Sequence, residues 1–397
     1  MPTDENLHRW RDEFPILSQS VYMISNSLGA MPRAAAEHLA DYARTWATRG
    51  VRAWEDRWWE MALEIGDKIA RVIGAPRGTV SMHENVTTAH LVALSCLRPK
   101  GARRRIVCTA MDFPSMVYLY RAQQDLGFEL HVVPGEDDLT VRTDRLIEAI
   151  DDRTAAVCFS HVLFRTSYIM DAAAIAARAR EVGAPVILDT YQSAGIIPVD
   201  VAALGVDFAV GGCLKWLCGG PGNAFLYTHP DRLRSAQPSF TGWVSQEHPF
   251  SFELDGAGVR GDAMRMMNGT PAVPAYYAAL AGLDIINDVG VDRIREQSKR
   301  LTARILELVA GHGFASAAAR DPERLAGTVA VDVPDALRVS QTLKSRNFIV
   351  DYRPPVGVRI SPHFYNTMAE VDRIVAEIAE IVATKQYAAP DVRSRVT

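Results

Sequence analysis

Two side chains of opposite charge, Asp189 and Lys215, follow short apolar runs in the middle of the chain. Asp189 ends the run 186–188, and Lys215 follows the run 208–210 after a pair of glycines. Ligands of parallel α/β sheets bind beyond the carboxyl ends of the strands, so we expect both side chains at one edge of a sheet. A lysine amine condenses with the aldehyde of pyridoxal 5'-phosphate (PLP), and a carboxylate keeps the pyridine nitrogen protonated. The pair therefore predicts a PLP site in which Lys215 forms the Schiff base and Asp189 holds the ring nitrogen.

The setting of Lys215 decides between this chemistry and a structural alternative. Taken alone, Asp189 is explained equally well as a helix cap, and Lys215 as a surface lysine. The neighbours of the lysine are glycines and a tryptophan, namely Gly211, Gly212, Trp216, Gly219 and Gly220. A solvated lysine rarely has so apolar and glycine-rich a setting, which favours the catalytic interpretation.

The elements that must position the pair form an α/β pattern. Short apolar runs alternate with longer amphipathic segments, which predicts a mostly parallel sheet covered by helices. Runs this short and apolar suit strands that are buried on both faces. The predicted strands are 106–109, 130–133, 155–159, 186–188, 208–210 and 224–227, and helices are expected at about 115–126 and 172–182.

The ends of the chain differ from the middle. A long helix is expected from about Pro271 to Leu306, broken by Gly282 and Gly290. Strands at 327–333, 348–351 and 358–361 and a helix at 369–382 then predict a small α+β domain. The expected organisation is an N-terminal segment (1–60), a large PLP-binding domain (61–275) and a small C-terminal domain that includes the linking helix (276–397).

Composition narrows the class of protein. The 397 residues carry a net charge of −4, with 48% hydrophobic and 23% charged residues, so neither a nucleic-acid nor a membrane partner is expected. No apolar run is long enough to span a bilayer, and the polar start does not read as a secretory signal. The five cysteines lack the spacing of a zinc site or a disulfide framework, so we expect reduced thiols, no metal and a cytoplasmic protein.

The segment around the pair resembles class V aminotransferase-like PLP enzymes of fold type I, and within them the kynureninase family. The matching residues there are Asp189, Gln192, Ser193, Gly195, Lys215 and the run 219–222. Similar short motifs recur in order along most of the chain, at 26–29, 66–70, 113–115, 164–166, 242–243 and 269–271. The resemblance implies an aspartate-aminotransferase-like fold, with a mainly parallel seven-stranded sheet in the large domain and a small α+β domain.

The resemblance also implies which residues hold the cofactor. Phe113 is expected to stack on the pyridine ring, although a core phenylalanine at a strand end is the structural alternative. Thr87 and Thr88 are expected at a helix N-terminus that binds the phosphate, a role compatible with simple capping. Gln192 is expected to bond the phenolic oxygen of the ring. Trp243 and Thr270 resemble residues that reach the phosphate from the neighbouring subunit, which implies a homodimer with shared active sites.

The amino-acid substrate has its own candidate residues. Asn26 and Ser27 belong to an N-S-L-G segment that the resemblance places near the substrate. Arg359 matches the arginine that grips the substrate α-carboxylate, as a guanidinium can do with two parallel hydrogen bonds. The alternative is an arginine that bridges the two domains.

Three positions depart from the kynureninase pattern: Gln192 replaces a usual histidine, Leu214 a tyrosine and Cys218 an asparagine. The favoured reaction is kynureninase-like hydrolysis of a C–C bond. Other class V reactions stay open: C–S lysis or β-elimination, epimerisation and transamination. Cysteine desulfurase proper is disfavoured because no cysteine follows Cys218 to act as the mobile nucleophile. A non-catalytic PLP-fold binding protein is the alternative from another class.

Overall fold

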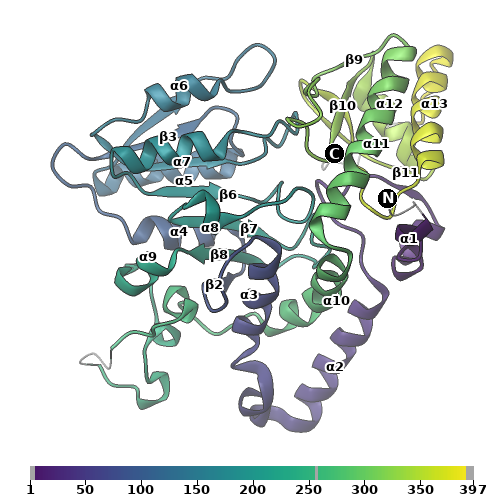
Figure 1. The fold of residues 1–397 in the computed structure, drawn as a ribbon. Helices are drawn as coiled ribbons and strands as arrows, with labels where there is room; N and C mark the ends of the chain where they lie inside the picture. The colour runs from purple at the N-terminus through teal and green to yellow at the C-terminus, as the bar shows by residue number, and fades with distance from the viewer. Residues whose placement is uncertain (1–4, 255–257, 390–397) are drawn as a thin grey trace.

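The computed structural model describes residues 5–254 and 258–389. Figure 1 shows a large part built on a central sheet, beside a smaller part that contains the C-terminal elements from α11 to α13. The N-terminal segment runs along both parts, with α1 (Glu5–His8) near the small one and α2 (Arg33–Arg49) below the sheet. Helix α10 (Val273–Val289) connects the two.

The central sheet has seven strands in the order β2-β8-β7-β6-β5-β3-β4. β8 runs antiparallel to both of its neighbours, and the other neighbouring pairs are parallel. This confirms the mainly parallel seven-stranded sheet. The strands are β2 (Val80–His83), β3 (Arg105–Thr109), β4 (Glu129–Val133), β5 (Thr154–Ser160), β6 (Val186–Asp189), β7 (Phe208–Gly212) and β8 (Ala224–Thr228).

Helices cover both faces of the sheet. Successive residues of a strand point to opposite faces, so each central strand contributes side chains to two hydrophobic cores. In β6, Ile187 packs into a core with Ala89 of α4, whereas Leu188 packs into a second core with Ile175 of α7. The central strands are therefore apolar throughout, which is the pattern that the sequence shows. The covering helices are α3 (Met61–Val72), α4 (Val86–Ser95), α5 (Pro114–Ala122), α6 (Thr143–Glu148), α7 (Ala172–Glu181), α8 (Val201–Leu204) and α9 (Pro230–Ser235).

The small part has its own antiparallel sheet and its own hydrophobic core. Its strand order is β12-β13-β10-β9, with β9 (Ala315–Ser316), β10 (Val329–Asp332), β12 (Asp351–Arg353) and β13 (Gly357–Ile360). Helices α11 (Val291–Gly311), α12 (Ala336–Ser345) and α13 (Met368–Thr384) pack around it. The N-terminal segment joins this part, because β1 (Val21–Tyr22) pairs with β11 (Phe348–Ile349). The domain boundaries at 60 and 275 stay a prediction.

Two expectations about the C-terminal half were wrong. The expected strand 348–351 is two strands, β11 and β12, which pair with different partners. The long helix breaks at Gly290, whose φ of 84° suits a glycine, but it runs straight through Gly282. Gly282 serves a close approach, since a Cβ there would lie 2.4 Å from the carbonyl oxygens of both Leu217 and Cys218.

Alanine at Gly282 should therefore destabilise the protein, although alanine is the better helix former. We expect Gly282→Ala to lower the free energy of unfolding by about 1–3 kcal/mol, because α10 must move away from the loop that carries Lys215. Gly311→Ala is the matched control, because a Cβ at Gly311 would meet nothing within 4 Å. Denaturant unfolding of both variants checks this, and equal stability of the two would contradict the close-packing explanation.

Candidate active site

Lys215 lies in the loop that follows β7 and faces a cavity of about 230 Å³ that is open on one side. Its Nζ is 4.4 Å from the centroid of the Tyr191 ring and 6.0 Å from that of Phe113. Phe113, Asp189, Gln192 and Lys215 all line this cavity, so the structure brings these four predicted residues together. Burial in the protein lowers the pKa of Lys215 to about 8. A lysine with this pKa has an appreciable neutral fraction near neutral pH, as a nucleophile or a base requires.

Asp189 is the last residue of β6, next to β7 in the sheet. Its side chain is buried, and Oδ1 accepts a hydrogen bond of 2.8 Å from the backbone N–H of Tyr191. Burial raises the pKa of this carboxyl to about 6, while the nearby positive charge of Lys215 opposes the rise. The two ends of neighbouring strands thus hold the acid and the amine at the same edge, as the parallel sheet predicts.

The cofactor-free protein should react with PLP faster as the pH rises toward about 8 and should then level off. Only the neutral amine attacks an aldehyde, and below its pKa the neutral fraction falls about tenfold for each pH unit. An ordinary lysine would level off above about pH 10 instead. The growth of the visible absorbance band, followed by stopped flow between about pH 6 and 10, measures this. A rate that still rises between about pH 9 and 10 would exclude the lowered pKa.

Phe113 is placed at the mouth of the cavity by the residue before it. The buried carboxylate of Asp112 accepts hydrogen bonds from the backbone N–H and hydroxyl of Thr109 at the end of β3. Its other oxygen accepts one from the backbone N–H of Ser160 at the end of β5. Phe113 is 43% exposed and meets the ring of Phe164 edge-on at 5.2 Å. An exposed ring here is not the core phenylalanine of the structural alternative, and its face is open to a planar ligand.

The start of α4 faces the cavity, because Asn85 and Val86 both line it. Asn85 caps the helix by accepting hydrogen bonds from the backbone N–H of Thr88 (3.0 Å) and from its hydroxyl (3.3 Å). Thr88 therefore takes part in the cap that the sequence analysis gave as its alternative. The helix N-terminus is still oriented toward the cavity, which is the arrangement that binds a phosphate. The phosphate roles of Thr87 and Thr88 stay predictions.

Gln192 is held by two hydrogen bonds from different parts of the chain. Its Nε2 donates to the backbone oxygen of Asn26 (3.0 Å), and its Oε1 accepts from the indole of Trp216 (3.0 Å). Asn26 is buried, yet its side-chain nitrogen and oxygen have no hydrogen-bond partner among the described residues. A buried amide without partners is costly, so a ligand that bonds to it would be favoured. Ser27 is half-buried beside it.

Arg359 is buried and has taken the bridging position that was its alternative. Its Nε donates to Oδ1 of Asp351 (2.8 Å), and its Nη2 donates to the other oxygen of the same carboxylate. Its Nη1 donates to the backbone oxygen of Phe164 in the large part (2.6 Å). A guanidinium has five N–H donors, so two remain for a ligand. The carboxylate clamp stays a prediction, and Asp351 is a partner that the sequence analysis missed.

Trp243 and Thr270 do not line the cavity of their own chain. Trp243 packs instead against Trp59 and Phe250, with ring centroids 5.4 and 5.7 Å away. The segment between α9 and α10 that carries both residues extends away from the sheet in Figure 1. Their action across a dimer interface stays a prediction.

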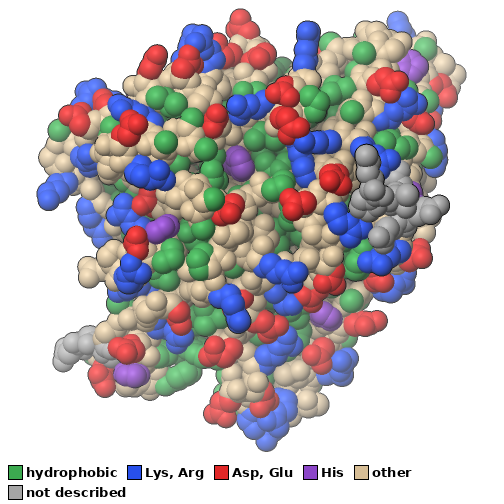
Figure 2. Space-filling view, in the orientation of Figure 1, with side chains coloured by type: hydrophobic (Ala, Val, Ile, Leu, Met, Phe, Trp, Pro, Cys, Tyr) green, Lys and Arg blue, Asp and Glu red, His purple; other side chains and the backbone are tan. Residues whose placement is uncertain are grey.

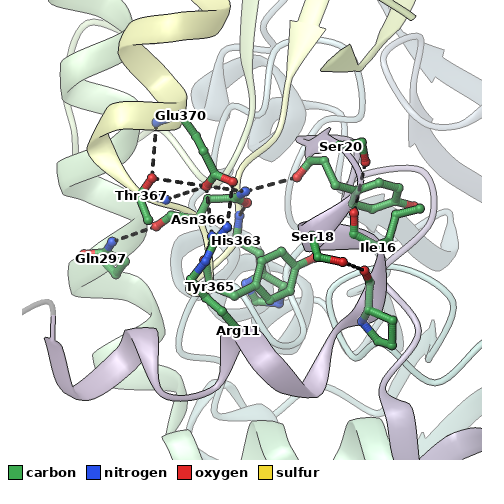
Figure 3. Close-up of polar contacts among 12 residues, drawn as sticks. Arg11, Ile16, Ser18, Ser20, Gln297, His363, Tyr365, Asn366, Thr367 and Glu370 are labelled. Atoms are coloured by element: carbon green, nitrogen blue, oxygen red, sulfur yellow. Dashed lines mark hydrogen bonds and ion pairs between the residues drawn. The ribbon is translucent and has the colours of Figure 1, made fainter. Parts of the chain in front are cut away.

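A hydrogen-bond network runs from the N-terminal segment through the small part to the loop of Lys215, and Figure 3 shows its part from Arg11 to His363. Arg11 forms an ion pair with Glu370 (2.9 Å), and Glu370 accepts a hydrogen bond from Asn366 (3.2 Å). Asn366 in turn accepts one from the backbone N–H of His363. The His363 ring is neutral, because burial lowers its pKa to about 4, and its Nε2 donates to the carbonyl oxygen of Trp216 (2.8 Å). The residue that follows Lys215 is therefore held from the small part.

The face shown in Figure 2 has hydrophobic side chains in the hollow between the two parts and charged side chains around it. The residues that the structure describes include no group of three or more metal-binding side chains, and none of their helices is long and apolar enough to cross a membrane. A half-buried lysine in a cavity, a carboxylate at a strand end, an open aromatic face and a helix N-terminus are the set that suits PLP.

Comparisons with known proteins agree with this reading. A family model described as "Aminotransferase class-V" matches residues 21–374. A protein described as "Uncharacterized aminotransferase YcbU" from Bacillus subtilis (strain 168) is 32% identical over 375 residues, covering 94% of this chain and 97% of that protein. A kynureninase from Bacillus anthracis is 29% identical over 399 residues, covering 96% of this chain and 93% of that protein.

A solved structure gives the fold independently. The cysteine desulfurase from Thermococcus onnurineus NA1 superposes with a TM-score of 0.84 at 23% identity, covering 97% of this chain and 99% of that chain. At this identity the likeness shows the fold alone, which confirms the α/β architecture with a smaller C-terminal part. Because the family model matches most of the sequence, the chain belongs to the class-V aminotransferase family, whose cofactor is pyridoxal 5'-phosphate.

Proposed function

We propose that this chain cleaves an amino-acid side chain by hydrolysis of a carbon–carbon bond, as kynureninases do. The observation that carries the proposal is the position of Lys215, which lines a cavity together with Asp189. Val162 and Phe164 give the cavity an apolar wall that suits an aromatic side chain. The kynureninase relative, which matches 96% of the chain, supports the same choice.

Each residue has a defined task in this proposal. Bound PLP withdraws electrons from the α-carbon of the amino acid. Lys215 takes the α-proton as the general base, and the two free donors of Arg359 hold the α-carboxylate. Asn26 lies behind the lining residue Gln192, and in this proposal its unpartnered amide bonds to the substrate. Water then adds to the γ-carbonyl, the Cβ–Cγ bond breaks, and the products are alanine and the acid derived from the side chain.

Leu214 favours a second candidate, C–S lysis or another β-elimination. It lines the cavity immediately before Lys215, where the resemblance has a tyrosine, and it cannot donate a proton. A reaction that needs no phenol at this position fits that change. Tyr191 brings a phenol to the same cavity, so the change at Leu214 does not remove proton donors from the site.

The test is to add L-kynurenine and L-3-hydroxykynurenine to the PLP-loaded protein and to assay the anthranilate products. Product formation at a rate near the typical enzyme range of about 1–1000 s⁻¹ would support the proposal. Absence of product, with a cofactor spectrum that changes on addition of another amino acid such as L-cystine, would replace it by the second candidate. No product and no spectral change with any amino acid would leave the chain as a PLP-binding protein.

A further inference from the structure

His90 lies close to Asp189, in the core, and is not among the residues that line the cavity. His90 of α4 is fully buried, and its Nε2 is 4.0 Å from Oδ2 of Asp189. Its Nδ1 is 3.2 Å from the hydroxyl of Tyr120, which is buried on α5. Three elements, α5, α4 and β6, thus place a phenol, an imidazole and a carboxylate in a row.

The protons of this row follow from its environment. Burial lowers the pKa of His90 to about 3, so the ring is neutral and carries a single N–H. Burial raises the pKa of Tyr120 well above its usual range, so the phenol keeps its proton and can donate it to Nδ1 of His90. The histidine proton is then on Nε2, the nitrogen that faces Asp189.

Nε2 of His90 has no hydrogen-bond partner among the described residues. A buried N–H without a partner costs about 1–3 kcal/mol, so a small movement that closes the gap from 4.0 Å to a normal hydrogen bond of about 3 Å is favourable. Asp189 has one oxygen to receive it, because Oδ1 is already bonded to the backbone N–H of Tyr191. The arrangement leaves Oδ2 for His90 on one side and for the cofactor on the other.

We propose that His90, oriented by Tyr120, is a positioning residue that holds Asp189 in its charged form and so keeps the ring nitrogen of bound PLP protonated. The inference rests on the role proposed for Asp189. Asp112, the other buried carboxylate nearby, is instead held by three hydrogen bonds from Thr109 and Ser160 and does not line the cavity. The remaining titratable groups around the row are Lys215, Tyr191, Cys108 and Cys158.

Helix α4 gives the row a further consequence. The helix begins at the cavity with Val86 and carries His90 about one turn later, roughly 6 Å along its axis. The same rigid element therefore faces the cavity at its start and Asp189 at its second turn. Both expected polar ends of the cofactor, the phosphate and the ring nitrogen, depend on one helix.

The test is ¹⁵N NMR of protein loaded with PLP that is labelled at the pyridine nitrogen, because the chemical shift reports directly whether that nitrogen carries a proton. His90→Leu removes the donor, His90→Gln keeps an N–H near the same place, and Tyr120→Phe removes only the hydroxyl. Tyr118→Phe is the control for the last change, because Tyr118 is on the same helix and 66% exposed. Asp189→Asn is measured in parallel as the reference for a lost carboxylate.

We expect the nitrogen of the unchanged protein to stay protonated from about pH 6 to 9. In His90→Leu it should lose its proton at a pH at least one unit lower, and kcat should fall about tenfold with little change in KM, as is typical when an orienting partner is removed. In His90→Gln the pyridine nitrogen should lose its proton at nearly the same pH as in the unchanged protein. In Tyr120→Phe that pH should fall less than in His90→Leu, and in Tyr118→Phe it should not fall.

The outcomes separate this inference from the proposed function. A protonated nitrogen in His90→Leu, together with deprotonation in Asp189→Asn, would overturn the role of His90 and leave that of Asp189 intact. No effect in Asp189→Asn would overturn both. If His90→Leu proves too unstable to load with PLP, Tyr120→Phe decides the question: a titration equal to that of Tyr118→Phe also overturns the role of His90.

Discussion

Replacing Lys215 by alanine should give a folded protein that binds PLP only non-covalently and has lost activity by about 10⁴-fold or more, since both the covalent link and the general base are removed. Lys215 faces the cavity rather than the core packing, so the change leaves no buried partner without its bond. Borohydride reduction followed by mass spectrometry measures the link, because reduction fixes the cofactor on its lysine. Lys100→Ala is the control at an exposed lysine.

The result that would overturn this assignment is a reduced cofactor still attached to the protein in Lys215→Ala, at whichever lysine the peptide map then shows. If the covalent bond to PLP is lost but activity stays nearly full, Lys215 holds the cofactor and another group removes the α-proton. Tyr191 is the first candidate for that group, because its ring lies 4.4 Å from the amine.

Arg359→Lys should raise KM for the amino-acid substrate about 100-fold, equivalent to about 2.7 kcal/mol of binding free energy. A lysine keeps one positive charge beside the buried Asp351 but cannot hold two carboxylates in fixed geometry. Removing the charge altogether would leave the buried Asp351 with only the more distant Arg353, at 3.7 Å, so that a loss of stability would be confused with a loss of binding. The lysine variant therefore tests the clamp more sharply than alanine.

Steady-state kinetics and denaturant unfolding of this variant are measured together. Arg346→Lys is the control, because Arg346 pairs with Glu377 and Glu380 within the small part. Arg359, in contrast, donates to the backbone oxygen of Phe164, a residue that lines the cavity. A loss of stability in Arg359→Lys without a change in KM would show that this arginine only bridges the two parts, through Asp351 and the backbone of Phe164.

The strands of the central sheet were predictable because they are buried on both faces. Six apolar runs became β3 to β8 with ends that differ from the expected ones by one or two residues. β2 was not expected, because its polar Ser81 and His83 interrupt the apolar pattern. In the structure these two side chains hydrogen-bond to each other (3.0 Å), which removes the cost of burying them. Such a pairing is invisible until the strand is in place.

The site was predictable in part for a similar reason. Asp189 and Lys215 could be placed because a parallel sheet brings its strand ends together, whatever the loops do. Asp351 and His90 could not be found, because each depends on a contact that exists only once the strands and helices are packed: Asp351 with Arg359 on the neighbouring strand, and His90 with Asp189, which lies 99 residues later in the chain. Tyr191 could have been predicted from its position alone, because it lies two residues after Asp189 at the same strand end.

The network of Figure 3 has a consequence for how the protein matures in the cell. The loop of Lys215 contacts Gly29 from the N-terminal segment and His363 from the small part, so its geometry depends on segments separated by most of the chain. During synthesis the early segments emerge first and wait for the later ones. We therefore expect the site to reach its final geometry only after residues beyond 363 have left the ribosome, and PLP to bind late rather than to act as a nucleus for folding.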